Sequence, residues 1–255
     1  MTAELPAATA SRLDWHVASV TDVRRETART CSIVLDVPQW PGHRAGQHVD
    51  VRLVADDGYQ AQRSYSIASP PEDASLVLTV ERIDDGEVSP YLCDVLQAHD
   101  GLELRGPIGG YFVWDIAEGG PLLLVAGGSG VVPLAAMLRH RAHAAASVRA
   151  SVPAHLLYSA RTWDDIIYRD DLEQLAKFSD VTVAFTITRE APSDWRGYRR
   201  RIDRAMLEEI GWPPSATPRA YVCGPTPLVE SVATLLVEIG HDPARVRTER
   251  FGPTG

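Results

Sequence analysis

The stretch from Pro121 to Pro133, PLLLVAGGSGVVP, joins an uninterrupted apolar run to three glycines within four residues. The apolar run predicts a strand buried on both faces of a parallel sheet. The glycines predict a tight turn in which the backbone can approach a pyrophosphate, and the N-terminus of the following helix would offer unpaired N–H groups there. Tight turns also carry glycines for structural reasons alone. The position of these glycines after the first parallel strand favours a dinucleotide site.

Helical and strand patterns alternate through the rest of the chain. Helices are predicted at residues 133–143, 164–178, 203–209 and 227–239, and strands at residues 154–158, 181–187, 220–223 and 246–251. This alternation predicts an α/β doubly wound parallel sheet.

The first half of the chain has a different pattern. Short strands are predicted at residues 15–23, 31–37, 48–54, 62–68, 76–83 and 101–105, with one helix at residues 89–98. Turn signals separate the strands, which predicts an antiparallel β-barrel. We therefore expect a barrel domain at residues 15–116 and an α/β domain at residues 117–255, with the linker in Asp115–Gly120. Residues 1–14 are expected to form a mobile tail.

Composition limits the possible partners of the chain. The 255 residues carry a net charge of −9, which disfavours nucleic acid as a partner. No apolar run is long enough to span a membrane, and the first residues lack the pattern of a secretory signal. Arginine clusters at residues 24–25, 139–141 and 199–201 are interpreted as solubilising, with docking of an acidic protein as the alternative. We expect a monomer.

The three cysteines, Cys31, Cys93 and Cys223, are few and widely separated. Their spacing fits neither a disulfide framework nor a zinc or iron–sulfur site. We therefore expect no resident metal and a cytoplasmic location.

Two residues of the second half bear on the choice of nucleotide. Arg161 follows the second predicted strand, where an acidic residue would favour NADH and an arginine can accommodate the 2′-phosphate of NADPH. Arg169 could assist. NADPH is therefore the expected nucleotide, with NADH possible because Asp164 and Asp165 lie close by.

Arg63-Ser64-Tyr65-Ser66 alternates polar and aromatic side chains along one predicted strand of the first half. Arginine can pair with phosphate, tyrosine can lie against a flat ring, and serine can donate to a ring nitrogen. Downstream, Gly86 to Ser89 precede the predicted helix, whose N-terminus would suit a second pyrophosphate. This diphosphate segment favours FAD over FMN.

Together these motifs resemble the ferredoxin–NADP reductase-like flavoenzymes, over residues 15 to 255. The matching elements, in order, are Arg63–Ser66, Gly86–Ser89 with Tyr91-Leu92, Gly106–Phe112, Gly127–Pro133, Cys223–Pro225 and Glu249–Gly252. The resemblance implies a FAD-binding barrel followed by an NAD(P)-binding domain, with the flavin in the cleft between them.

The resemblance also implies residue roles in this chain. Arg63 would contact the FAD pyrophosphate, Tyr65 would pack on the ring or ribityl chain, and Ser66 would hydrogen-bond the flavin N5 edge. Cys223 would lie by the nicotinamide, and Glu249 and Phe251 would close over the isoalloxazine. The remaining implied cofactor contacts are Gly86, Val88 and Ser89 for FAD, and Gly127, Gly128, Ser129, Gly130, Val131, Gly224 and Pro225 for NADPH.

The predicted function is transfer of hydride from NADPH to FAD, followed by transfer of electrons to a separate acceptor such as a ferredoxin or an oxygenase component. Holding the two rings together needs no acid–base residue, because the cofactors carry the chemistry. The sequence departs from some relatives in having too few cysteines for a [2Fe–2S] domain, and from plant-type members in lacking a terminal tyrosine. The alternatives are an NAD(P)H:flavin reductase or diaphorase, and a non-catalytic subunit that binds flavin and nucleotide.

Overall fold

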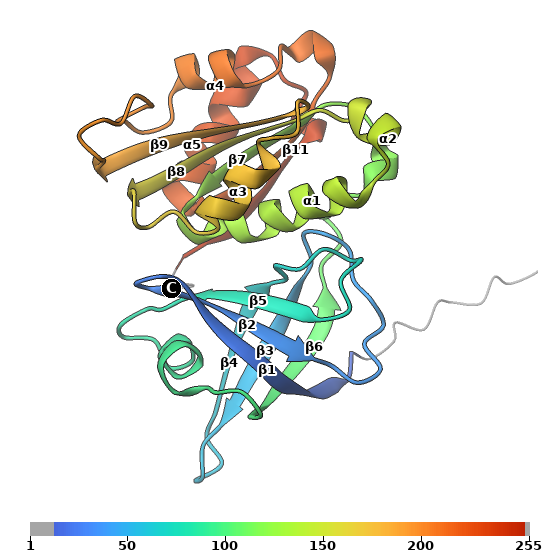
Figure 1. The fold of residues 1–255 in the computed structure, drawn as a ribbon, viewed down its shortest axis with the longest axis vertical. Coiled ribbons are helices and arrows are strands. Elements are labelled where there is room, and N and C mark those ends of the chain that lie inside the picture. Colours follow the sequence, from blue (N-terminus) through green and yellow to red (C-terminus); the bar gives the residue numbers. More distant parts are fainter. Residues whose placement is uncertain (1–12, 253–255) are drawn as a thin grey trace, which may run out of the picture.

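The computed structural model describes residues 13–252. Most of the tail expected at residues 1–14 lies outside the described residues. The chain forms two stacked halves, a β-barrel and an α/β half (Figure 1). No helix within residues 13–252 is long and apolar enough to cross a membrane.

The barrel half is a six-stranded antiparallel sheet in the order β4-β3-β6-β1-β2-β5. Its strands are β1 (Trp15–Thr27), β2 (Thr30–Asp36), β3 (His48–Val54), β4 (Gln60–Ser66), β5 (Leu76–Glu81) and β6 (Gly101–Ile108). A bridge between Ile67 and Leu78 brings the chain after β4 against β5, so the two edges of the sheet meet. Alternate residues of these strands, among them Ile33, Val49, Leu78 and Leu104, fill the interior. The predicted antiparallel barrel is confirmed.

The α/β half contains five parallel strands in the order β11-β10-β7-β8-β9. The strands are β7 (Leu122–Gly127), β8 (Ala154–Thr162), β9 (Val181–Glu190), β10 (Arg219–Pro225) and β11 (Val246–Phe251). The helices are α1 (Val131–His143), α2 (Ala146–Ala150), α3 (Arg169–Leu175), α4 (Arg204–Ile210) and α5 (Thr226–Ile239). Every residue of β7 is buried, as its apolar run predicts, and the predicted doubly wound sheet is confirmed.

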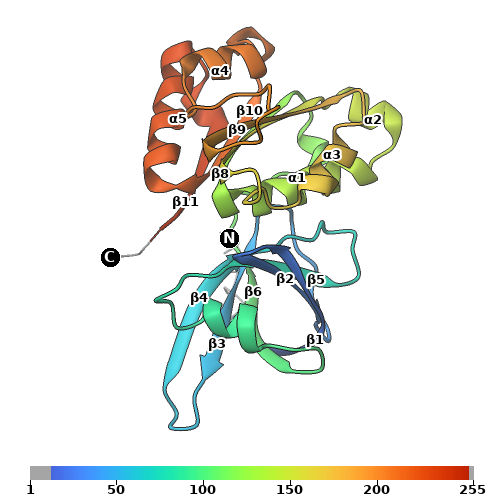
Figure 2. The ribbon, with the colours of Figure 1, turned by 60° about the vertical axis from the view of Figure 1, so that its left-hand side comes forward.

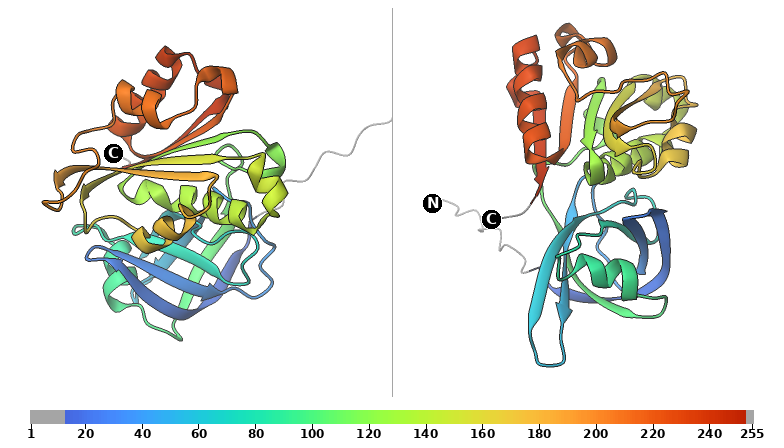
Figure 3. Two further views of the ribbon diagram at one scale, coloured as in Figure 1. Left: turned by 45° about the horizontal axis from the view of Figure 1, so that its top comes forward. Right: turned by 90° about the vertical axis from the view of Figure 1, so that its left-hand side faces the viewer.

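The parallel sheet has helices on both faces. Helices α4 and α5 cover one face, and α1 and α3 cover the other, which is the face turned toward the barrel (Figure 2). The strand order changes direction between β7 and β10. The two halves lie one on the other (Figure 3), and residues at the carboxyl ends of β7, β8, β10 and β11 line the cleft between them. A switch of this kind is where doubly wound folds bind ligands.

Three local predictions differ from the structure. The helix predicted at residues 89–98 is a single π-helical turn, Tyr91–Val95. The helix predicted from Asp164 begins only at Arg169, because Thr162 and Asp165 form a turn through reciprocal hydrogen bonds of 3.1 and 3.2 Å. The sequence does not predict the short helix α2, because its five residues, ASVRA, include a single large apolar side chain and give little amphipathic pattern.

Residues 109–121 connect the two sheets in an ordered path. The side chain of Asp115 accepts from Ala117, and Glu118 accepts from the backbone of Asp115, which forms a capping box around a short 3₁₀ turn. The linker predicted in Asp115–Gly120 therefore coincides with a capped turn.

Candidate functional site

A cleft of about 760 Å³ lies between the barrel and the α/β half. The barrel contributes β4, β5 and the loop before the π-helical turn, and the α/β half contributes the carboxyl ends of its strands. Most of the predicted site residues line this cleft: Arg63, Tyr65, Ser66, Gly86, Val88, Ser89, Gly127, Gly128, Ser129, Arg161, Pro225, Glu249 and Phe251. The fold thus brings the two predicted cofactor sites together in one space.

The remaining predicted site residues lie elsewhere. Gly130, Val131, Cys223 and Gly224 form the layer behind the cleft wall, and Val131 and Cys223 are fully buried. Arg169 lines a separate hollow, where its guanidinium lies 5.2 Å from the centre of the Trp163 ring. The structure therefore separates Arg169 from Arg161, although the sequence places them near each other.

The turn predicted to bind a pyrophosphate, Gly127–Val131, is called the phosphate-binding turn below, and it depends on a close approach of two strand ends. A Cβ added at Gly130 would lie 2.2 Å from the carbonyl oxygen of Cys223, so only glycine allows β7 and β10 to end this close together. Gly128 has a φ of +54° and nothing within 4 Å of its Cβ position. No side chain caps α1 or the 3₁₀ turn Gly128–Gly130 that leads into it, and the Val131 N–H donates to the carbonyl oxygens of Gly128 and Ser129. These features fit a pyrophosphate at this turn.

The barrel side of the cleft, where the resemblance would place the flavin, is called the flavin wall below. It carries an ion pair that the sequence did not predict. Arg63 donates to Glu87 Oε2 at 3.1 Å, and Glu87 also accepts from the Tyr59 hydroxyl at 2.7 Å. Glu87 lies inside the Gly86–Ser89 motif, so its charge could have been noticed there. Ser89 Oγ accepts from the backbone N–H of Ile83 at 3.0 Å and holds the loop in shape. The Arg63 guanidinium is suited to a cofactor diphosphate, but the diphosphate would have to compete with the Glu87 carboxylate for Arg63.

Two side chains on neighbouring strands meet at the opposite wall. Cys223 on β10 is in register with Glu249 on β11, and its thiol donates to Glu249 Oε2 at 3.8 Å. Burial raises the pKa of the Cys223 thiol well above its ordinary value, so the thiol stays neutral. Burial raises the pKa of Glu249 to about 7. The contact between Cys223 and Glu249 therefore combines a neutral thiol with a carboxyl group that titrates near neutral pH.

Arg161 is exposed at the end of β8 and faces the cleft. Asp165 lines the same cleft, and its carboxylate accepts a hydrogen bond from the backbone N–H of Thr162. Within residues 13–252 no cluster of three or more His, Cys, Asp or Glu side chains could hold a metal ion.

Comparisons with known proteins give the family. Two family models match, an oxidoreductase FAD-binding domain over residues 15–113 and an oxidoreductase NAD-binding domain over residues 124–234. Ferredoxin–NADP reductase B of Sorangium cellulosum is 38% identical over 217 residues, which cover 81% of this chain and 84% of that protein. The glycine betaine monooxygenase reductase subunit of Chromohalobacter salexigens is 33% identical over 245 residues, which cover 94% of this chain. The solved structure of the Amycolatopsis cytochrome P450 reductase GcoB matches with a TM-score of 0.81 at 26% identity, over 97% of this chain and 74% of that chain.

The protein is thus an oxidoreductase with one domain of the FAD-binding type and one of the NAD-binding type. It belongs to the ferredoxin–NADP reductase-like family, as its motifs indicate. The chain spans 65% of the length of the glycine betaine monooxygenase reductase subunits that it matches.

The pairing of Arg63 with Glu87 predicts the effect of Glu87→Gln on FAD affinity. The substitution frees Arg63 and removes a negative charge beside the diphosphate, so we expect FAD to bind about three- to tenfold more tightly. Quenching of FAD fluorescence on addition of the flavin-free protein measures the dissociation constant. Glu103→Gln is the matched control, because Glu103 pairs with Arg52 outside the cleft. Equal effects of the two substitutions would contradict the prediction.

The raised pKa of Glu249 predicts that the difference in stability between Glu249→Gln and the wild type depends on pH. Its pKa is about 7 in the folded protein and 4.5 ordinarily, so the folded state bears an increasing desolvation cost as the pH rises from about 4.5 to 7. Glu249→Gln removes this cost. We expect the free energy of unfolding of Glu249→Gln, minus that of the wild type, to increase by roughly 2 kcal/mol from pH 5 to pH 8.

Urea unfolding at the two pH values measures this gain. Glu208→Gln, a substitution of an exposed carboxyl group on α4, serves as the control. A constant difference between Glu249→Gln and the wild type at both pH values would show that the Glu249 carboxyl group is not perturbed.

Proposed function

We propose that this protein is a reductase that takes hydride from NADPH onto FAD and passes the electrons to a separate acceptor protein. The observation that carries the proposal is the single cleft lined by Ser66 of the barrel and Glu249 of the α/β half. A shared cleft allows two rings to be held together while water is excluded. We place the domain boundary at residues 116 and 117, within the capped turn, which gives domains at residues 15–116 and 117–255.

Bound FAD would supply the ring that accepts hydride, and the residues of this chain would position it. Arg63 would break its ion pair with Glu87 and pair with the diphosphate instead. The loop of Gly86, Val88 and Ser89 would surround the diphosphate. The half-buried Tyr65 would support the ring or ribityl chain, and Ser66 would face its N5 edge. Burial raises the pKa of Tyr65, so its hydroxyl remains protonated.

The α/β half would position the nucleotide. The turn formed by Gly127, Gly128, Ser129, Gly130 and Val131 would hold its pyrophosphate, with Gly224 and Pro225 supporting the turn from β10. Cys223 would lie at the nicotinamide, and Glu249 and Phe251 would close over the isoalloxazine from the last strand. A neutral Cys223 thiol presents no charge to the nicotinamide, whereas ionised Glu249 would favour the positive ring that forms when hydride leaves.

The names of the relatives suggest the kind of acceptor. They include reductase components of monooxygenases and a ferredoxin–NADP reductase. We therefore propose that a ferredoxin or an oxygenase component receives the electrons. A cytoplasmic location is supported by the three free, buried cysteines. A monomer remains our expectation.

A second candidate function is an NAD(P)H:flavin reductase, in which flavin is itself the substrate. The Arg63–Glu87 pair favours it, because a carboxylate that competes for the arginine weakens the binding of a diphosphate. Retention of FAD during purification distinguishes the two functions: flavin that washes out and is turned over in solution supports the second.

Anaerobic reduction tests the main proposal. The protein is loaded with FAD and mixed with NADPH, and bleaching of the flavin absorbance is followed. We expect complete bleaching by one equivalent of NADPH, and subsequent reoxidation by an added one-electron protein acceptor. A protein that takes up no FAD, or FAD that NADPH does not bleach, would contradict the proposed function.

The position of the Arg161 side chain in the cleft predicts a preference for NADPH over NADH. Arg161→Ala removes the cation at the end of β8, so we expect the KM for NADPH to rise about tenfold or more and the KM for NADH to change little. Steady-state reduction of ferricyanide measures both constants. Arg169→Ala is the matched control and is expected to leave both unchanged, because Arg169 lies outside the cleft. An equal rise for both nucleotides would assign Arg161 to general phosphate binding.

A further inference from the structure

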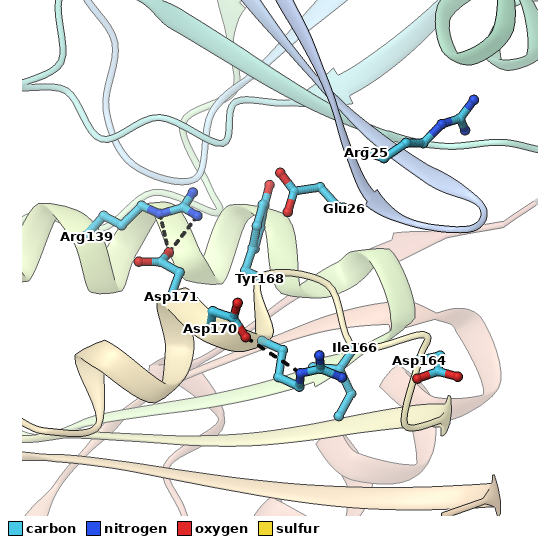
Figure 4. Close-up of a pocket in the computed structure, with 9 residues that line it drawn as sticks. Arg25, Glu26, Arg139, Asp164, Ile166, Tyr168, Asp170 and Asp171 are labelled. Carbon is cyan, nitrogen blue, oxygen red and sulfur yellow. Dashed lines mark hydrogen bonds and ion pairs between the residues drawn. The ribbon is translucent and has the colours of Figure 1, made fainter.

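A second hollow, of about 440 Å³, lies where the β1–β2 hairpin of the barrel faces α1 and the start of α3. Tyr168 stands in its wall, between Arg139 and Glu26, and points from the α/β half toward the barrel (Figure 4). The preceding residue, Ile167, lines the large cofactor cleft. Tyr168 therefore belongs to the partition between the two cavities.

The backbone of Tyr168 is held in an unfavourable conformation. Its φ of +59° and ψ of +29° lie in the left-handed region, which bulky residues rarely adopt. The side chain is nevertheless buried, with 7% of its surface exposed. A strained, buried residue persists only where surrounding contacts fix it, and such residues concentrate at functional sites. For Tyr168 those contacts come from both halves of the molecule, with Arg139 in the α/β half and Thr79 in the barrel.

The Tyr168 hydroxyl enters a chain of hydroxyl groups on the outer face of the barrel, because Ile33 and Leu78 beside them on the strands point inward. It hydrogen-bonds Thr79 Oγ1 on β5, Thr79 Oγ1 lies 2.8 Å from Ser32 Oγ on β2, and Ser32 Oγ donates to Glu26 Oε1 at 2.6 Å. A carboxylate can only accept, which fixes the direction of every step. Ser32 donates to Glu26, so Thr79 donates to Ser32 and Tyr168 donates to Thr79. Chains of this kind polarise each bond in turn.

Two further contacts hold the ring. The Arg139 guanidinium lies 4.3 Å from the centre of the Tyr168 ring and donates to Asp171 on α3 at 2.8 Å. Its other end donates to the carbonyl oxygen of Ala68 in the barrel at 2.7 Å. Burial raises the pKa of Tyr168 to about 12, so its hydroxyl remains a donor throughout the neutral range.

We infer that Tyr168 is a positioning residue, which fixes the α/β half on the barrel at the distance that hydride transfer requires. It acts through Thr79, whose side chain lines the cofactor cleft from the far side of the partition. The inference rests on the proposed function and deepens it. A misplacement of about 1 Å between reacting groups can reduce a rate about a hundredfold, so a hydrogen bond that sets this distance has a large effect on the rate.

Tyr168→Phe and Thr79→Val each remove one partner of the bond and preserve the shape of the side chain. We expect each to slow the reduction of bound FAD at saturating NADPH by about tenfold or more, while the KM for NADPH stays within about twofold. The double variant should be no slower than either single variant, because all three lack the same bond. Tyr198→Phe is the matched control, because Tyr198 is a half-buried tyrosine of the α/β half that lines neither cavity.

Amide hydrogen exchange of the same four variants gives a readout that needs no flavin. Exchange at residues 77–81 and 166–172 should quicken equally in Tyr168→Phe, Thr79→Val and the double variant, and should stay at the wild-type rate in Tyr198→Phe. Wild-type rates of both reduction and exchange in Tyr168→Phe would overturn the inference. So would additive effects of the two substitutions.

The two proposals fail in different ways. If NADPH does not reduce the wild-type protein, the proposed function fails, and hydrogen exchange alone then decides whether Tyr168 holds the halves together. If the wild type is reduced normally and Tyr168→Phe is reduced as fast, the positioning role fails and the proposed function stands.

Discussion

The burial of α1 on two sides is the constraint on which the rest of the structure depends. The helix packs against β7 and β10 on one side, and against the barrel on the other. Ten of its thirteen residues are buried, including His140 and Arg141. The Nδ1 atom of His140 lies 2.6 Å from Glu72 of the barrel, and Arg139 reaches Ala68. The same helix begins at the phosphate-binding turn, so its position relative to the barrel also places the nucleotide relative to the flavin wall.

The cleft differs in charge from the protein as a whole. The chain is strongly acidic, yet the charged side chains that line the cleft are balanced, with Arg29, Arg63, Arg161 and Arg250 facing Glu81, Glu87, Asp165 and Glu249. Two polyanionic cofactors would bind here under the proposed function, and a balanced lining lowers the repulsion that the rest of the molecule exerts. Part of the balance is internal, because Glu87 already neutralises Arg63. Specific pairing therefore matters more to the cofactor sites than net charge does.

The sequence predicted the features that depend on local pattern. The apolar run that forms β7, the glycines after it and the alternation beyond it follow from burial and turn geometry, so the fold and most of the cleft lining could be derived. The start of α3 could not be derived, because no periodic pattern reveals the turn between Thr162 and Asp165 or the left-handed conformation of Tyr168. The separation of Arg161 from Arg169 likewise depends on the turn at Thr162, which a helical pattern conceals. The pairing of Arg63 with Glu87 joins residues 24 positions apart, and no periodicity indicates it.

The barrel is built from one continuous segment, and its last strand, β6, ends at Ile108. During synthesis the barrel segment emerges first, and domains generally fold as units in that order. Ser32 and Thr79 can therefore already be in place on the outer face of a closed sheet when Tyr168 leaves the ribosome. At that stage the Thr79 oxygen lacks the donor that the α/β half later brings. The α/β half would thus fold in contact with a barrel that is already folded. The order of the elements along the chain would in this way guide the assembly of the cleft.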